Sequence, residues 1–508
     1  MIMKHKFIIT GILGIALLLP TGCDKYLDVN FDPSNPQVAE GFAILPPMLA
    51  QMVRGESFDA RYVGQYVQNW ASTAKNNVFD QHGYTPGSDA AGEKWRQHYW
   101  AIGKNIDLMI EQASAKQQWD YVGVAKAIRA WSWQSSTDVY GEMILKQAWE
   151  PNRYVFDFDT QDLVYEEVER LSMEALTDLN RTDGAVSEAG LGRGDLVYKG
   201  KREQWIKFVY ANLARNAHHL TNKANYNPDK VIEYVDKSFT SNADNFNVPH
   251  AGTGSADGNF FGATRNNLRT YRQTAYMLSL LDGTVFNGVA DPRLPLMLSA
   301  SPDGVYRGVS PTAGDPTNVN NDPTRIPLVW GVSPSVTDAK LIPGKYIFTD
   351  KAPHPLITYF EMQFVKAEAA FIKGDKTMAY DAFKKGIRAH MDFAGVAVAD
   401  QDAYMASAAA PQAEGDLKLS DIMLQKYIAL WVHGALETWV DMRRYHYDSQ
   451  VYTGFTLPAT LYLDNGGKLV YRLRPRYNSE YVWNRQSLDV FGGNNPDYHT
   501  YEPWFIKQ

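Results

Sequence analysis

The stretch from Leu356 to His390 constrains the fold more than any other part of the chain. Apolar side chains recur there at helical spacing, first at Phe360, Phe364, Ala367 and Phe371 and then at Ala379, Phe383 and Ile387. Gly374 and Asp375 separate the two series, which predicts two helices joined by a tight connection. The length and the connection resemble a tetratricopeptide-type helix pair. Because one such pair cannot bury its own apolar face, further helices must pack against it.

Four other stretches are also predicted to be helical. They cover residues 119–137, 161–180, 203–220 and 420–446. Trp131, Trp205 and Trp439 lie on regular helix faces and are assigned to the core. No strict sequence period joins the helices. The predicted fold is therefore mostly α, with an irregular tetratricopeptide-like helical scaffold.

Two segments interrupt the helical pattern and are rich in Gly, Pro, Asn, Asp and Ser. They span residues 72–92 and about 242–355, and within the second only residues 265–281 are predicted to be helical. The C-terminal stretch 450–508 is mixed, with a β-like fragment at 468–471. Loop-rich regions of this size inside a compact protein are more often functional than accidental.

The first 22 residues have the pattern of an export signal. The charged segment Lys4-His5-Lys6 precedes an uncharged stretch from Phe7 to Pro20, which is too short to span a bilayer comfortably. Thr21-Gly22-Cys23 resembles a bacterial lipobox, which predicts cleavage before Cys23 and lipid attachment to that residue. The alternative is an ordinary signal peptide followed by an incidental thiol. No later segment is apolar enough to span a bilayer, so we expect membrane attachment through the lipid alone.

The rest of the chain is predicted to form a tether and one domain. Residues 23–47 are rich in Asp, Asn and Pro, with turns expected at Asp32-Pro33 and Asn35-Pro36, and are interpreted as a lipidated N-terminus and extended tether. Residues 48–508 are interpreted as a single helical domain that carries the loop-rich insert.

Charge and cysteine content exclude several classes of protein. The chain has 50 Lys and Arg against 57 Asp and Glu, and its net charge of −7 argues against a nucleic-acid partner. One cysteine leaves no internal disulfide and no multi-cysteine zinc site. Aromatic residues make up 13% of the chain, which is enough for a large core and for a ligand surface as well.

No constellation typical of an enzyme emerges from the motifs. Gly308-Val309-Ser310 lacks the closing glycine of a nucleophile elbow. The adjacent His218 and His219 point about 100° apart on a helix and are a poor chelating pair. We therefore predict no catalytic residue, no metal site and no cofactor. Carboxylates are numerous, however, and a pair at glycosidase separation stays open.

A dense charge cluster lies in the predicted helix 420–446, at Glu437, Asp441, Arg443 and Arg444. It is either an anion site or a structural cluster. Asp441 and Arg444 stand three residues apart and can pair on one helix face, which favours the structural interpretation.

Several motifs together resemble one known family. They are Cys23–Asn30 followed by Asp32-Pro33 and Asn35-Pro36, Ala125–Ala130 followed by Asp138–Glu142, Asp291–Leu294, Gln425–Trp431 followed by Gly434, Glu437, Trp439, Asp441 and Arg443-Arg444, and Arg476–Glu480 with Asn484. Taken jointly, they resemble the SusD/RagB family of outer-membrane glycan-binding lipoproteins. The residues around Gln425 are most similar to its second SusD-like subgroup.

The resemblance implies a helical scaffold whose irregular loops form a large loop-rich ligand-binding face. It also implies a partner, a SusC-like TonB-dependent transporter, over which the lipoprotein acts as a lid that passes on an oligosaccharide. The implied location is the outer membrane, lipid-anchored and exposed at the cell surface.

A sugar-binding face needs aromatic side chains for the apolar faces of the sugar and polar side chains for its hydroxyl groups. Aromatic residues in polar loops are better candidates for this role than those on helix faces. The candidate ligand-binding residues are Asn76, Phe79, His82, Tyr84, Phe260, Phe261, Arg265, Asn266 and Trp330. Such rings also serve to pin loops to a scaffold, so both interpretations stay open.

The favoured hypothesis is a non-catalytic surface lipoprotein that binds an oligosaccharide and delivers it to the transporter. One alternative is a secreted glycoside-processing enzyme on a helical scaffold. Another is a member of the same family that binds a peptide or glycopeptide. A third is a helical-repeat scaffold that binds only protein.

Overall fold

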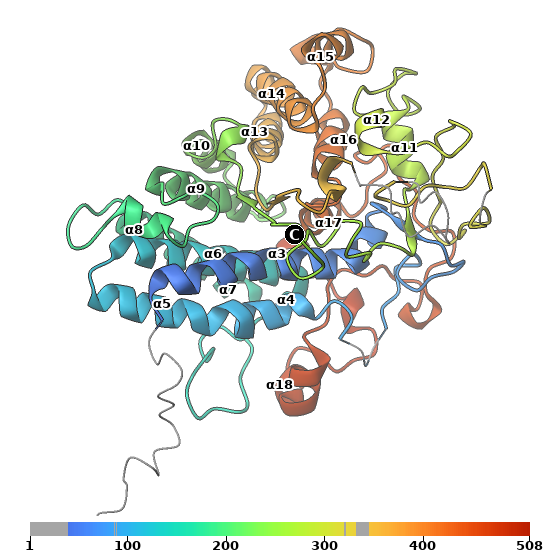
Figure 1. The fold of residues 1–508 in the computed structure, drawn as a ribbon. Helices are drawn as coiled ribbons and strands as arrows, with labels where there is room; N and C mark the ends of the chain where they lie inside the picture. Colours follow the sequence, from blue (N-terminus) through green and yellow to red (C-terminus); the bar gives the residue numbers. More distant parts are fainter. Residues whose placement is uncertain (1–38, 86, 88, 320–321, 332–344) are drawn as a thin grey trace, which may run out of the picture. The chain divides into compact units, whose positions relative to one another are not determined.

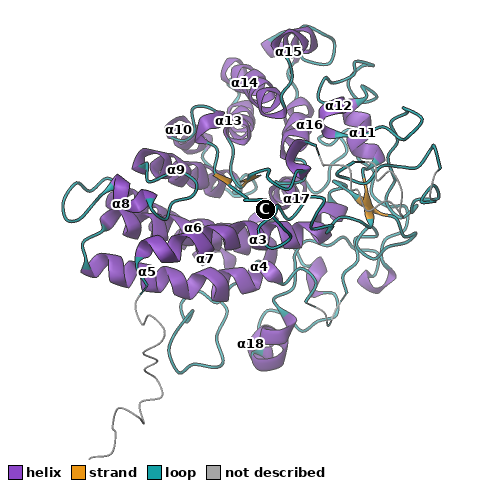
Figure 2. Cartoon of the chain, viewed as in Figure 1, coloured by secondary structure: helices purple, strands orange, loops and turns teal. Residues whose placement is uncertain are grey.

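The structure is a computed structural model that describes residues 39–85, 87, 89–319, 322–331 and 345–508. The predicted signal peptide 1–22, the lipidation site Cys23 and most of the predicted tether lie outside the described residues. Residues Gly41–Gln508 form one compact unit, and helices dominate it (Figures 1 and 2). The prediction of a mostly α fold is confirmed.

The first part of the scaffold packs helices from the N-terminal half of the chain. Its elements are α3 (Gly41–Tyr66), α4 (Glu93–Arg96), the π-helix η1 (Gln97–Gly103), α5 (Lys104–Ala115), α6 (Trp119–Tyr140), α7 (Gln161–Leu179), α8 (Glu188–Gly192), α9 (Arg202–His218) and α10 (Pro228–Lys237). Helices α5, α6 and α7 lie side by side (Figure 1). The helices predicted at 119–137, 161–180 and 203–220 are α6, α7 and α9, and are confirmed.

The predicted hairpin is present as α13 (Tyr359–Lys373) and α14 (Lys376–Ala394). The Thr358 hydroxyl accepts a hydrogen bond from the Glu361 N–H at 3.3 Å and caps α13. Gly374 ends α13 with φ 88°, a left-handed conformation that glycine adopts without strain. Asp375 then caps α14 by accepting from the Met378 N–H at 3.0 Å. These caps explain why Gly-Asp is a sufficient connection.

The helix predicted over 420–446 is broken in the structure, which corrects that prediction. Helix α16 covers Leu419–Leu430 and α17 covers Ala435–Arg444. Between them Val432 has φ 75°, and its N–H donates to the side-chain oxygen of Asn69 at 2.8 Å. The Trp431 indole N–H donates to the Asn69 carbonyl at 3.0 Å. Contacts from a residue far away in the chain therefore override the local helical pattern.

Three other boundaries differ from the sequence prediction. Helix α3 begins at Gly41, inside the predicted tether, because Ile44, Leu45, Met48 and Leu49 are buried at helical spacing despite Pro46 and Pro47. In the segment 265–281 only α11 (Ala275–Leu281) is helical, because Tyr271 and Arg272 are recruited into a strand. The β-like fragment 468–471 forms no strand, and the Tyr471 N–H bonds to the His499 carbonyl in irregular structure.

Of two small antiparallel sheets, one ties the loop-rich segment to the residues that follow α3, and the other joins the two ends of that segment (Figure 2). Strand β1 (Ala71–Ser72) pairs with β3 (Tyr271–Arg272), and β2 (Asn247–Val248) pairs with β4 (His354–Pro355). The segment also carries α12 (Leu294–Met297), while α15 (Val398–Met405) and α18 (Arg485–Asp489) extend the C-terminal part. Of the helices in the described ranges, none has the length and apolar character to cross a membrane.

The core is apolar but contains a network of buried charges. Trp131, Trp205 and Trp439 are buried, as predicted. Arg444 pairs with Asp441 at 2.6 Å, which confirms the predicted structural pair, and also with Glu368 at 2.8 Å. All three side chains are almost fully buried, so each charge depends on its partners for solvation.

Candidate functional site

A row of cationic and aromatic side chains runs along one side of α3, at Arg54, Phe58, Arg61 and Tyr62. The helical spacing of these residues places them on one stripe, separate from the buried stripe that includes Leu45, Leu49 and Met52. Phe58, Arg61 and Tyr62 are half-buried, so part of each side chain is accessible. We call these four residues the α3 row.

Loop residues extend the α3 row on both sides. The Phe58 ring lies 6.1 Å from Phe260 between centroids, and the Tyr62 ring lies 4.8 Å from Phe79. The Arg61 guanidinium lies 4.1 Å from the Phe58 ring centroid and 5.4 Å from that of Phe260. Rings from two loops and a helix therefore form one continuous aromatic strip with a guanidinium stacked on it.

A pocket of about 330 Å³ adjoins one end of this strip, between α3 and the loop 248–258. Gln51 and Arg54 line it from the helix, and His250 and Asp257 line it from the loop, together with Phe260 and Arg265. The Arg265 guanidinium lies 5.5 Å from the Phe260 ring centroid. This volume falls within the range of small-molecule sites, roughly 300–1,000 Å³.

The pocket and the α3 row contain several side chains that can donate hydrogen bonds. Burial and the neighbouring charge of Arg54 lower the pKa of Arg265, while Arg54 itself pairs with Glu93 at 2.8 Å. Burial lowers the pKa of His250, although its ring bonds to the Ala352 carbonyl at 3.0 Å. The neutral imidazole, the guanidinium groups and the Gln51 amide are suited to bond hydroxyl groups, and the rings are suited to stack on an apolar sugar face.

The structure brings together three of the residues predicted from sequence as ligand-binding, namely Phe79, Phe260 and Arg265. The two phenylalanines are largely buried, with exposed fractions of 9% and 6%, so each presents only an edge. Arg265 is half-buried and lines the pocket. Ligand contact by these residues remains a prediction.

The other predicted residues lie apart from this strip or are covered. Tyr84 is buried, donates its hydroxyl hydrogen to the Ala90 carbonyl at 2.7 Å and stacks on His499. His82 is buried between Tyr66 and Tyr447, and burial lowers its pKa to about 4. These side chains pin the 72–92 loop to the scaffold.

In the second loop segment, Phe261 packs on Trp70 and His354, and Trp330 is buried as well. Asn76 is exposed and Asn266 is half-buried, and both adopt φ 54°. Their backbone N–H groups bond within loops, that of Asn76 to the Thr312 carbonyl at 3.0 Å. Asparagine tolerates this conformation better than most residues, so a turn role accounts for both.

Sequence reasoning missed Phe58, Arg61 and Tyr62 because it singled out no helix over 41–66 and sought ligand-binding rings only in polar loops. One signal could have found them. Two aromatic and two cationic residues share a stripe that is offset from the apolar stripe of the same helix, which is unusual for a face that only packs.

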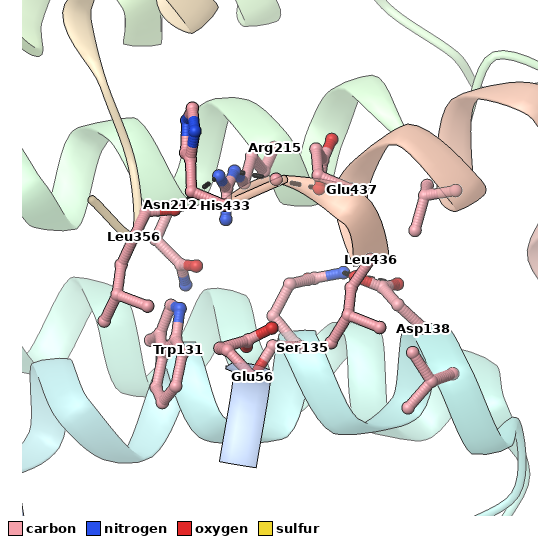
Figure 3. Close-up of a pocket in the computed structure, with 14 residues that line it drawn as sticks. Glu56, Trp131, Ser135, Asp138, Asn212, Arg215, Leu356, His433, Leu436 and Glu437 are labelled. Carbon is pink, nitrogen blue, oxygen red and sulfur yellow. Dashed lines mark hydrogen bonds and ion pairs between the residues drawn. The ribbon is translucent and has the colours of Figure 1, made fainter. Parts of the chain in front are cut away.

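A second cavity lies in the interior, between α3, α6, α9 and α17 (Figure 3). Its lining is mixed, and its polar side chains include Ser135, Asn212 and His433. Arg215 and Glu437, 3.8 Å apart, also line it. Its volume of about 30 Å³ suits one or two water molecules and is far too small for a sugar ring. This cavity is therefore not a candidate for the binding of an oligosaccharide.

Comparison with known proteins identifies relatives of similar architecture. Residues 33–472 match the family model SusD-like_2, described as starch-binding associating with outer membrane. No match was found among curated proteins.

Solved structures match over nearly the whole length. A chitin-binding protein is 21% identical with a TM-score of 0.69, covering 91% of this chain and 100% of that chain. A chitin-binding SusD homolog from Flavobacterium johnsoniae is 17% identical with a TM-score of 0.68, and the match covers 92% of this chain and 98% of that chain. A SusD/RagB family protein from Bacteroides thetaiotaomicron is 21% identical with a TM-score of 0.66, and the match covers 92% of this chain and 99% of that chain. At these identities the likeness shows the fold.

Proposed function

The chain belongs to the SusD-like family, and on that premise we propose that it binds a glycan along the α3 row and in the adjoining pocket. The observation that carries the proposal is the strip formed by Phe260, Phe58, Tyr62 and Phe79, with Arg61 stacked on it. Phe58 and Tyr62, the two half-buried rings of the strip, offer two neighbouring stacking positions, while Phe260 and Phe79 contribute ring edges, which suits an oligosaccharide better than a single sugar.

Two solved relatives are described as chitin-binding, which supports an N-acetylated or unmodified neutral glycan as the first ligand class to examine. The donors around the pocket fit the carbonyl and hydroxyl oxygens of such a ligand. A peptide or glycopeptide is the alternative ligand within the same family.

The proposed role is non-catalytic. Among the residues that line the pocket beside α3, Asp257 is the one carboxylate. Its carboxylate accepts hydrogen bonds from the N–H groups of Thr253 and Gly254 at 3.0 and 2.8 Å, which commits it to the loop structure. A glycosidase needs two carboxylates flanking the bond that is cleaved. This composition supports a binding function over the glycoside-processing alternative.

We further propose that the protein is anchored to the outer membrane through Cys23, is exposed at the cell surface, and delivers its ligand to a SusC-like TonB-dependent transporter. The family description of association with the outer membrane supports this location. Labelling with radioactive palmitate in the native host tests the anchor. Label should enter the wild type and be absent from Cys23→Ala, and label in that variant would overturn the anchor.

Affinity electrophoresis in gels containing soluble starch or glycol chitin tests the binding proposal. Ala50 is an exposed residue on α3 that lines the pocket. A larger side chain at this position should fill the pocket without removing a contact of the core. Ala50→Phe should migrate faster than the wild type in the gel that retards the wild type. Ala399 is exposed on α15, so Ala399→Phe is the matched control and should be retarded like the wild type. Release of reducing ends during incubation would overturn the non-catalytic role.

A further inference from the structure

A third pocket lies on the helical side of the molecule, between α5, α6, α7 and the chain segment 145–150 that follows α6. It has a volume of about 380 Å³, within the range of small-molecule sites, roughly 300–1,000 Å³. It shares no lining residue with the pocket beside α3. Neither the α3 row nor the loop-rich segment contributes to it, so the function proposed above does not account for it.

Trp149 is the most unusual residue of this pocket. Its backbone has φ 62°, in the left-handed region that bulky side chains rarely adopt. The indole N–H donates to the Tyr99 carbonyl at 2.7 Å, and the ring lies 5.9 Å from that of Trp133. A glycine would fit this backbone conformation without strain. That a half-buried tryptophan is held there instead suggests that its ring has a role in the pocket.

Arg129 holds the Trp149 ring from one side. Its guanidinium lies 4.2 Å from the ring centroid and donates to the Asp107 carboxylate at 2.6 Å and to the Gly103 carbonyl at 2.9 Å. Gly103 permits this arrangement, because a Cβ there would lie 2.4 Å from the indole ring. Arg129, Gly103 and Tyr99 therefore fix the position of an aromatic platform before any ligand arrives.

The charges of the pocket are balanced, and this defines the ligand class. Three cations and three carboxylates line it, namely Lys126, Arg129, Arg170, Asp107, Glu150 and Glu167. Each cation is already paired: Lys126 with Asp178 at 2.8 Å, Arg129 with Asp107, and Arg170 with Glu167 at 2.6 Å. A phosphate or another anion would need a free cation. A neutral ligand with many hydroxyl groups needs only the donors and acceptors that these pairs still offer.

We infer that this pocket is a second carbohydrate site, which takes one neutral sugar residue against Trp149 while the ionic side chains bond its hydroxyl groups. A site on the helical side would let one glycan chain, or two, contact the protein at separate places. Two weak contacts on one chain raise the overall affinity without any change at either site.

The test uses the full mature chain labelled with 5-fluorotryptophan and observed by ¹⁹F NMR. The Trp149 signal is assigned by its loss in Trp149→Phe. Maltohexaose and chitohexaose serve as probes, and at least one of them should shift the Trp149 signal in a saturable way. Ala148 lines the pocket, and Ala148→Phe should weaken that response by about tenfold or more by filling the site.

Two controls separate this inference from the function proposed for α3. Ala50→Phe, which fills the other pocket, should leave the Trp149 response to maltohexaose and chitohexaose unchanged, and so should Ala399→Phe. If the starch and chitin gels do not retard the protein but the sugars still shift the Trp149 signal, only the proposal for the α3 site is overturned. The second site is overturned if neither sugar shifts the Trp149 signal, if Ala148→Phe leaves the shift unchanged, or if only an unglycosylated peptide produces it.

Discussion

The rings of Phe58 and Phe260 lie 6.1 Å apart between centroids, one on helix α3 and the other in the loop-rich segment. This contact joins the scaffold to the loops at the proposed glycan site. It makes α3 part of the proposed ligand surface as well as part of the scaffold.

Phe58 provides the first test of the α3 row. Phe58→Ala should weaken glycan binding by roughly 1 kcal/mol, about fivefold, because one stacking surface and the support for Arg61 are lost. Isothermal titration calorimetry with the oligosaccharide that binds the wild type measures the change. Tyr154→Ala is the control, since Tyr154 is 83% exposed and lies outside the row. Equal losses in the two variants would contradict the assignment.

Arg444 tests the buried charge network. Arg444→Met should lower the free energy of unfolding by about 3–5 kcal/mol, because Glu368 and Asp441 would lose the guanidinium that they share. One buried negative charge would then be uncompensated, although His218 still contacts Glu368 and Lys426 still pairs with Asp441. Arg170→Met is the matched control. Arg170 pairs with Glu167 but is 53% exposed, so its loss should cost about 0–1 kcal/mol. Urea denaturation followed by circular dichroism measures both, and similar values for the two would refute a role for burial.

Deprotonation of His219 should lower the free energy of unfolding at mildly alkaline pH. Burial by itself would lower its pKa, but Glu437 at 2.9 Å and Asp138 at 3.3 Å outweigh burial and raise the pKa to about 9. Because the pKa is raised on folding, the contribution is complete below pH about 6.5 and is lost as the pH rises toward 9. The free energy of unfolding should drop by up to about 3 kcal/mol across that window.

Urea denaturation at a series of pH values measures this drop, which should shrink in His219→Gln. His82 supplies the control. Burial lowers its pKa to about 4, so its contribution is complete above pH about 6.5 and is lost as the pH falls toward 4. His82→Asn should therefore leave the alkaline window unchanged. If the free energy of unfolding falls equally at alkaline pH in the wild type and in His219→Gln, another group is responsible for the effect.

The interior cavity of Figure 3 should hold ordered water. Asn212 lines it, and in the described part of the chain its side-chain amide has no hydrogen-bond partner. One or two waters fit the volume of about 30 Å³. A crystal structure at high resolution should show density within hydrogen-bond distance of the Asn212 amide and of the Ser135 hydroxyl. An empty, dry cavity at that resolution would refute the prediction.

Much of the scaffold could be predicted from sequence because helix formation is encoded locally. The spacing of Phe360, Phe364 and Ala367, followed by Gly374 and Asp375, predicts a hairpin that the structure confirms. The break at Val432 could not be predicted, since its hydrogen bond comes from Asn69. The strand at Tyr271 depends in the same way on a partner, Ser72, that is distant in sequence.

The residues of the candidate site could likewise be predicted only in part. Phe260 and Arg265 were predicted from their polar loop context, and they line the pocket. Tyr84 and Trp330 had the same context, yet their side chains are buried. Whether a loop ring faces solvent or the scaffold depends on where the loop folds back, and residue spacing carries no information on that.

The sequence by itself determined the helical class, the main hairpin and the family, because periodicity, caps and motifs act over a few residues. The tertiary structure decided which aromatic rings stay accessible, since burial depends on contacts between distant segments. It placed Phe58 beside Phe260 and held Trp149 against Arg129. Both proposed sites consist of side chains that are distant in the sequence and are brought together by packing.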